Sequence, residues 1–219
     1  MQIIKTGDGS SSIYRSDIDE HYHSVHGAIA EAKHVFIQYG LVAYNLQFPD
    51  KKKLEVLEVG FGTGLNASLL MESAEKLDVQ VNYFGVEPFP LEGTLINQLD
   101  YPGINQGYFK QIHQSDWGVA VDLSPFFNID KQQEKLLDCN PSQAVDLVFF
   151  DAFGPNAQPE MWEQDVFDYL YKRMSNHSLL TTYCAKGQVK RNLKAAGFKI
   201  EAQPGPPGKR EMTQAWKNG

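Results

Sequence analysis

Residues 57–66 read Leu-Glu-Val-Gly-Phe-Gly-Thr-Gly-Leu-Asn and decide the fold. They join an apolar strand predicted over 54–59 to a helix predicted from about Leu65 to Leu77. Alternating glycines at this junction permit turn dihedrals and leave bare backbone that a nucleotide-like ligand can approach. The acidic Glu58 just before the turn suits a cationic or hydroxyl-bearing ligand better than a pyrophosphate. The stretch therefore favours S-adenosylmethionine as the ligand.

Two better-known glycine motifs do not match this turn. The dinucleotide fingerprint G-x-G-x-x-G needs a glycine where this chain has Leu65. A P-loop needs Gly-Lys-Ser/Thr after the turn, and none follows. A purely structural turn stays open as an alternative. However, three glycines within five residues carry an entropic cost on folding, which indicates that they serve a function.

Strand and helix patterns alternate along the rest of the chain. An amphipathic helix is predicted over 20–39 after an irregular segment over 13–19, and a hairpin over 126–129 and 135–139. Further strands are predicted over 79–87, 108–113, 146–151, 178–183, 198–202 and 211–216, with helices over 91–99, 160–174 and 187–196. Such alternation predicts a Rossmann-like α/β fold: a mostly parallel sheet with a terminal antiparallel strand and helices on both faces.

Size and composition indicate one ordinary globular domain. The chain has 219 residues, 42% hydrophobic and 21% charged. We expect residues 1–50 to form an N-terminal helical attachment and 51–219 the core, within a single structural domain overall. With only two cysteines and no apolar run long enough for a membrane helix, we expect a cytoplasmic protein without membrane contact.

Charge is distributed unevenly along the chain. The net charge is −7, yet residues 181–219 carry eight basic and two acidic side chains. A basic end on an acidic body can present a phosphate-binding face. An ordinary solvated surface explains the same pattern equally well. The basic residues that we expect to contact RNA phosphates are Lys186, Lys190, Arg191, Lys209 and Arg210.

Four acidic residues fall at predicted carboxyl ends of strands, where α/β sheets bind ligands. They are Glu58, Glu87, Asp116 and Asp151. Glu87 is placed to accept hydrogen bonds from ribose hydroxyls. Asp116 is placed to accept from the adenine amine while Trp117 packs on the ring. Ordinary strand-end acids are the structural alternative for each.

Asp151 opens a proline-rich loop, Asp-Ala-Phe-Gly-Pro-Asn-Ala-Gln-Pro-Glu-Met-Trp, over 151–162. Its two prolines give the loop a fixed shape beside the expected methyl donor. A rigid loop that carries an acid and aromatic side chains suits a planar substrate. A merely structural turn is the alternative.

Three motifs together resemble one known family, the MnmC-type methyltransferase domain. They are Glu-Val-Gly-Phe-Gly-Thr-Gly-Leu-Asn (58–66), Ser-Asp-Trp (115–117) and Asp-Ala-Phe-Gly-Pro with Pro-Glu-Met-Trp (151–162). Tyr22, Ser24, Glu31, Val35-Phe36 and residues 208–212 extend the likeness over most of the chain. The family makes the last methylation of the wobble uridine modification 5-methylaminomethyl-2-thiouridine in bacterial tRNA.

The resemblance implies a class I methyltransferase fold and a set of site residues. It implies that the methionine and ribose parts of S-adenosylmethionine bind Glu58, Gly60, Phe61, Gly62, Thr63, Gly64 and Asn66. Glu87 would take the ribose, Asp116 and Trp117 the adenine, and Asp151 both the cofactor and the reacting amine. From the loop and the charge pattern, we expect the substrate tRNA to contact Phe153, Pro155, Lys186, Lys209 and Arg210, the basic residues through phosphates of the anticodon arm. Many family members are fused to a flavin-dependent oxidase, so we expect a separate enzyme to supply the aminomethyl intermediate here.

Other readings remain at this stage. His21, His23 and His26 cluster near the N-terminus, but no cysteine or suitably spaced acid accompanies them, and we predict no metal site. A methyltransferase of the same fold acting on a small-molecule amine or a protein side chain is the main alternative. A non-catalytic cofactor-binding module and an NAD-dependent oxidoreductase fit less well, the first because of Asp151 and the second because of Leu65.

Overall fold

A computed structural model describes residues 1–219 and contains a large mixed sheet. Its eight strands run in the order β10-β11-β9-β8-β4-β5-β7-β6. Neighbouring strands from β9 through β7 are parallel, whereas β11 is antiparallel to both β9 and β10, and β6 is antiparallel to β7. The strands are β4 (Lys53–Val59), β5 (Gln80–Val86), β6 (Val121–Ser124), β7 (Phe127–Gln132), β8 (Val145–Phe150), β9 (Met174–Thr182), β10 (Lys199–Pro204) and β11 (Glu211–Lys217).

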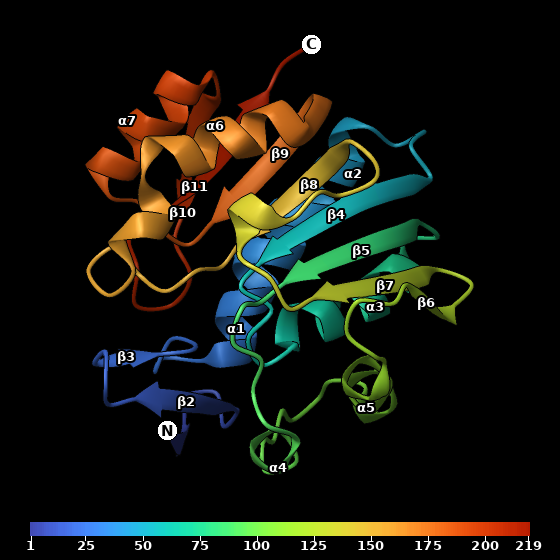
Figure 1. Ribbon diagram of the computed structural model, residues 1–219, viewed down its shortest axis with the longest axis vertical. Coiled ribbons are helices and arrows are strands. Elements are labelled where there is room, and N and C mark those ends of the chain that lie inside the picture. The colour runs from blue at the N-terminus through green and yellow to red at the C-terminus, as the bar shows by residue number, and fades with distance from the viewer.

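Helices cover both faces of this sheet, which confirms the predicted fold class (Figure 1). In Figure 1, α6 and α7 lie in front of the sheet and α2 and α3 behind it. Every residue of β8 is buried, as expected for a central strand covered on two sides. The covering helices are α3 (Leu65–Lys76), α6 (Gln164–Arg173), α7 (Gly187–Ala196) and a continuous N-terminal helix made of α1 (Ala28–Ala32), the π-helical η1 (Lys33–Val42) and α2 (Ala43–Gln47).

Smaller elements complete the chain. An antiparallel three-stranded sheet at the N-terminus lies beyond the carboxyl ends of the parallel strands, below the arrowheads of β5 and β7 in Figure 1. It consists of β1 (Gln2–Lys5), β2 (Ser11–Arg15) and β3 (Glu20–His21). The remaining helices are α4 (Gly93–Ile96), α5 (Gln106–Gln114), η2 (Leu136–Asp138) and η3 (Pro159–Trp162). None of the helices combines the length and apolar character that crossing a bilayer requires.

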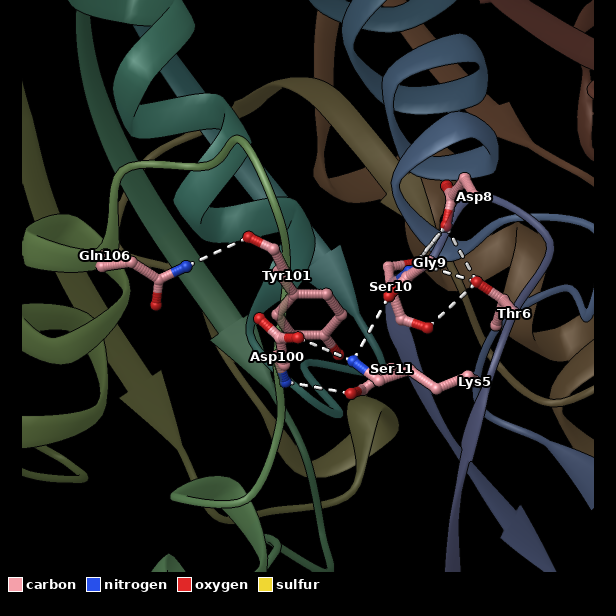
Figure 2. A network of polar contacts seen from close by, with 9 residues as sticks. All are labelled: Lys5, Thr6, Asp8, Gly9, Ser10, Ser11, Asp100, Tyr101 and Gln106. Atoms are coloured by element: carbon pink, nitrogen blue, oxygen red, sulfur yellow. Dashed lines mark hydrogen bonds and ion pairs between the residues drawn. The ribbon is translucent and has the colours of Figure 1, made fainter.

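Polar contacts fasten the N-terminal sheet to a segment that follows α4 (Figure 2). The Ser11 amide donates to the Asp100 carbonyl at 2.8 Å, and the Asp100 amide donates to Ser11 Oγ at 2.9 Å. Lys5 forms an ion pair with the Asp100 carboxylate at 2.7 Å. Because these contacts join distant parts of the sequence, we propose that residues 1–50 and 51–219 fold as one domain.

The start of the N-terminal helix differs from the sequence prediction. A helix was expected from residue 20, but α1 begins only at Ala28, and β2 occupies part of the segment expected to be irregular. The Asp8 carboxylate accepts a hydrogen bond from the Ala30 amide at 2.9 Å, so a residue distant in sequence caps the helix. Partial burial opposes ionisation, but hydrogen bonds from Ser10, Ala30 and Thr6 lower the pKa of Asp8 overall.

Two further predictions are wrong in the middle of the chain. Residues 108–113 form helix α5, not a strand: the Asn105 side chain accepts from the Tyr108 amide, and Phe109 and Ile112 bury one helical face. The hairpin falls earlier than predicted, between β6 and β7, with its turn at Pro125. Leu136 lies in a single helical turn, η2.

Candidate functional site

A cleft of about 900 Å³ opens at the carboxyl ends of β4, β5 and β8. Its walls come from the N-terminal sheet, the glycine turn, the segment after β5, the segment after β7 and the loop after β8. Ligands of open α/β sheets bind at this edge. The cleft therefore lies at the edge of the sheet where the sequence predicted ligand binding.

The glycine turn brings β4 close to the loop after β8. Gly60 has φ +86°, and a Cβ added there would lie 2.7 Å from the Asp151 carbonyl oxygen. Gly62 also has positive φ, and its amide donates to Glu87 Oε2 at 3.2 Å. Larger residues would therefore strain the backbone and push the Asp151 loop away.

Asn66 connects two carboxylates at the base of the cleft. Its Nδ2 donates to Glu58 Oε1 at 2.7 Å and to Asp151 Oδ2 at 2.8 Å. Tyr83 donates its hydroxyl to the other oxygen of Glu58. Burial raises the pKa of Glu58 to about 8, although the hydrogen bonds from Tyr83 and Asn66 act in the opposite direction. Glu58 is fully buried and does not line the cleft, so it supports Asn66 from beneath.

Asp151 reaches the cleft directly. Burial, followed by the negative charge of Glu31, raises the pKa of Asp151 to about 7. The Asn66 hydrogen bond and the positive charge of Lys209 act against this rise. A carboxyl group that titrates near neutrality is suited to exchanging a proton with a bound amine.

Glu87 lines the cleft at the end of β5. Its Oε2 accepts from the Gly62 amide and its Oε1 accepts from the Phe89 amide at 3.0 Å. Burial raises the pKa of Glu87. Two backbone donors thus fix the carboxylate where the sequence predicted a ribose contact. Phe61, Thr63 and Asn66 line the same cleft.

Asp116 and Trp117 lie outside the cleft. Trp117 packs edge-on against Phe61 with ring centroids 5.5 Å apart, and Asp116 is exposed. They were expected to follow a strand, but the preceding element is helix α5, and Trp117 forms a parallel bridge with Lys131 near the carboxyl end of β7. The cleft offers no support for their predicted adenine contact.

A segment after β7 also lines the cleft. Lys135, Leu136, Leu137 and Asp138 follow β7, the third parallel strand, and line the cleft. The sequence signal that could have located them is the alternation of apolar Phe127 and Ile129 with polar residues, which is typical of a strand and matches the burial pattern of β7. Gly64 also lies off the cleft, where it begins α3 in a left-handed conformation.

The N-terminal sheet supplies one wall of the cleft. The Tyr22 and Phe153 rings meet edge to face at 5.0 Å, and the Arg15 guanidinium lies 5.9 Å from the Phe153 ring centroid. His23 Nε2 lies 2.8 Å from Thr63 Oγ1, and burial lowers the pKa of His23 to about 4. The N-terminal segment therefore shapes both the glycine turn and the substrate side. No cluster of three or more metal-ligating side chains occurs in the structure.

A second, more open groove of about 610 Å³ adjoins the cleft. Pro155, Lys186 and Arg210 line it, and Lys209 lines both cavities. Lys186 Nζ donates to Asn156 Oδ1 at 2.7 Å, while the Arg210 side chain is 91% exposed. The structure thus brings the predicted basic residues Lys186, Lys209 and Arg210 together beside the predicted Phe153 loop.

The family of the chain follows from comparison with known proteins. A family model described as S-adenosyl-L-methionine-dependent methyltransferase matches residues 101–218, more than half of the chain. The chain belongs to this family. The predicted enzyme class and the predicted methyl donor are both confirmed.

Curated relatives of this methyltransferase carry the name tRNA 5-methylaminomethyl-2-thiouridine biosynthesis bifunctional protein MnmC. The protein of Cupriavidus metallidurans is 30% identical over 98% of this chain and 34% of the relative. That of Methylobacillus flagellatus is 29% identical over 91% of this chain and 33% of the relative. The methyltransferase therefore spans about a third of the length of the relatives it matches.

Solved structures support the same fold. MnmC2 from Aquifex aeolicus superimposes with a TM-score of 0.85 at 22% identity, covering 98% of this chain and 69% of that one. Magnesium protoporphyrin IX methyltransferase from Synechocystis PCC 6803, solved with bound SAH, gives a TM-score of 0.53 at 11% identity, covering 87% and 84%. At these identities the likeness concerns the fold of the methyltransferase.

The cleft residues fit S-adenosylmethionine. Asn66 Oδ1 is buried without a hydrogen-bond partner, so it is free to accept from a cationic amino group. The bare turn at Gly60 and Gly62 leaves room that a Cβ would fill, and Glu87 presents a fixed carboxylate beside it. These are the residues that we assign to hold the methyl donor of this methyltransferase.

Proposed function

We propose that this methyltransferase transfers a methyl group to the amine of 5-aminomethyl-(2-thio)uridine at the wobble position of tRNA. The observation that carries the proposal is the place of Asp151, a carboxyl group with a pKa near 7 directly beside the glycine turn. The printed names of the relatives, which concern 5-methylaminomethyl-2-thiouridine in tRNA, support the choice of substrate.

The residues around Asp151 suit a primary amine. Such an amine is mostly protonated at neutral pH and cannot attack until it loses a proton. When bound, S-adenosylmethionine supplies an activated methyl group on a sulfonium. Asp151 accepts the proton of the amine, and Asn66 holds its carboxylate in place. Phe153, with Tyr22 at its edge, offers a flat apolar surface for the uracil ring.

The adjoining groove suits an RNA backbone. Lys186 and Arg210 present cations at its surface, and Lys190 and Arg191 follow on α7. Residues 181–219 carry a net +6 on a chain whose total is −7, and three of their basic residues, Lys186, Lys209 and Arg210, line this groove. Phosphates of the anticodon arm would bind here while the wobble base enters the cleft.

The proposed methyl transfer needs an aminomethyl substrate. We infer that a separate activity supplies the free amine, because the methyltransferase spans only about a third of the bifunctional relatives that it matches. The expected location of such a reaction is the cytoplasm, where tRNA is modified.

A labelling experiment tests this function. The enzyme is incubated with S-adenosylmethionine labelled in its methyl group and with tRNA that lacks the final methyl. The label in the product is then measured before and after the product is digested with nuclease. We expect label in intact tRNA, and after digestion to nucleosides in 5-methylaminomethyl-(2-thio)uridine alone. Label that survives nuclease in a protein or small-molecule fraction would instead support the alternative methyltransferase functions.

A further inference from the structure

Glu31 is a buried carboxylate that faces the cleft from α1. Its side chain is 10% exposed, and its Oε1 accepts a hydrogen bond from the Ser24 amide at 3.1 Å. Its Oε2 pairs with Lys209 Nζ at 2.6 Å. A buried carboxylate depends strongly on its cation, because removal of one partner leaves an uncompensated charge.

The same Lys209 ammonium also lies on an aromatic ring. Its Nζ is 3.9 Å from the centroid of Tyr183. The Tyr183 hydroxyl donates to the Ala152 carbonyl at 2.8 Å, which fixes the ring beside the Asp151 loop. A carboxylate combined with an aromatic face is a general arrangement for binding an alkylammonium group. Glu31 and Tyr183 therefore form an ammonium site that a side chain of the protein itself fills.

This ammonium site adjoins the proposed reaction centre. Glu31, Tyr183 and Lys209 all line the cleft, and the charges of Glu31 and Lys209 act on Asp151. Lys209 also lines the cationic groove beside Lys186. It therefore stands at the boundary of the two cavities, within reach of both.

We propose that Lys209 is a stand-in for the substrate ammonium. When RNA binds, the ammonium of the aminomethyl group replaces Lys209 at Glu31 and Tyr183, and Lys209 turns toward a phosphate in the groove. The amine then lies beside Asp151, ready to lose its proton.

This exchange rests on the proposed function and adds a source of selectivity to it. A hydroxymethyl or unmodified uridine offers no cation to Glu31, so it cannot compensate the buried carboxylate when Lys209 leaves. Only a base with an amine completes the exchange. Glu31 and Tyr183 are then positioning residues that select the amine, distinct from Asp151, which takes its proton.

Binding without turnover tests the exchange. The affinities of 5-aminomethyluridine and 5-hydroxymethyluridine nucleosides are measured by calorimetry with the full chain saturated with S-adenosylhomocysteine. Lys209→Met should tighten aminomethyluridine binding by roughly tenfold, because the nucleoside no longer competes with an internal ion pair. Binding of hydroxymethyluridine should not change. Lys209→Arg, which keeps the cation, should behave like the wild type.

A second variant and an RNA complete the test. Glu31→Gln should weaken aminomethyluridine binding by about tenfold or more and leave hydroxymethyluridine unaffected. An unmodified anticodon stem-loop offers no ammonium that would release Lys209 from Glu31, so it should bind Lys209→Met and the wild type with similar affinity. If a thermal melt shows that Lys209→Met is unfolded, the proposal is decided by whether Glu31→Gln weakens the binding of aminomethyluridine and not that of hydroxymethyluridine.

The inference is overturned if Lys209→Met weakens or leaves unchanged the binding of aminomethyluridine, or if either variant changes both nucleosides equally. The proposed function fails separately, if wild-type enzyme leaves tRNA unlabelled. Selective nucleoside binding without tRNA methylation would keep the ammonium site and reject the tRNA substrate.

Discussion

Asn66 donates hydrogen bonds from one amide nitrogen to both Glu58 and Asp151, at 2.7 and 2.8 Å. It thereby connects a fully buried carboxyl group to one that reaches the cleft. Two carboxylates so close together repel each other when both are ionised. We therefore expect two pH dependences from this cluster: Glu58 affects the stability of the protein, and Asp151 affects the rate of methyl transfer.

Glu58 should make the protein less stable as pH rises. Its folded pKa of about 8 lies above the ordinary value of 4.5, so the folded state retains a proton that the unfolded state has lost. Between these two values the free energy of unfolding should fall by about 1 kcal/mol per pH unit from this group. Glu58→Gln mimics the protonated carboxyl and should remove that slope. Urea unfolding from pH 5 to 8 measures it, and equal slopes for both proteins would reject the assignment.

Asp151 should set the pH dependence of the rate. A base with a pKa of about 7 gives kcat/KM that rises with pH and levels off above that value. Since the Asn66 hydrogen bond lowers the pKa of Asp151, Asn66→Ala should move the midpoint upward. Rates at saturating methyl donor over pH 6 to 9 provide the comparison. A midpoint that stays in place would show that Asn66 does not tune this carboxyl group.

Gly60 should tolerate no side chain. Gly60→Ala forces a Cβ to 2.7 Å from the Asp151 carbonyl in a left-handed conformation, which costs roughly 1–2 kcal/mol from the dihedral alone. We expect a lower melting temperature and weaker binding of S-adenosylmethionine. Gly93→Ala is the matched control, because a Cβ there has no atom within 4 Å. Equal effects of the two substitutions would contradict the close approach of β4 and the Asp151 loop.

RNA binding should depend on salt through the groove. Lys186→Ala and Arg210→Ala should each reduce the slope of log Kd against log salt by about one, because each removes one phosphate contact. Lys110→Ala, an exposed lysine on α5, is the control and should leave the slope unchanged. Filter binding of tRNA at salt concentrations from about 50 to about 200 mM distinguishes the variants. An affinity that does not respond to salt would remove the groove from the RNA site.

Local sequence predicted the elements that carry their own signals. The turn at Gly60 follows an apolar strand and precedes a helix, and β8 is an unbroken run of buried residues, so Asp151 could be placed at its end. Helix α5 was misassigned as a strand because its apolar residues Tyr108, Phe109 and Ile112 form only a short pattern, although Asn105 before it is a typical N-cap residue. That misassignment put Asp116 and Trp117 directly after a strand, whereas they follow α5 and reach the sheet through the parallel bridge between Trp117 and Lys131.

Contacts between distant residues could not be predicted. The cap of α1 by Asp8, the bond between His23 and Thr63, and the pair formed by Lys209 and Glu31 each depend on tertiary structure. The basic residue Lys209 was predicted as a phosphate contact from charge alone. Charge cannot reveal that a buried carboxylate already holds it.

The most direct test of the account is the rate of methyl transfer in Asp151→Ala under single-turnover conditions. We expect the rate on aminomethyl tRNA to fall by about a hundredfold or more, the usual contribution of a general base. The affinity for S-adenosylmethionine, measured by calorimetry, should stay within a few-fold. Asp50→Ala, which removes an exposed carboxylate from the loop before β4 and outside the cleft, should keep the wild-type rate. A near-normal rate in Asp151→Ala would contradict the central claim that this carboxyl group takes the proton from the amine.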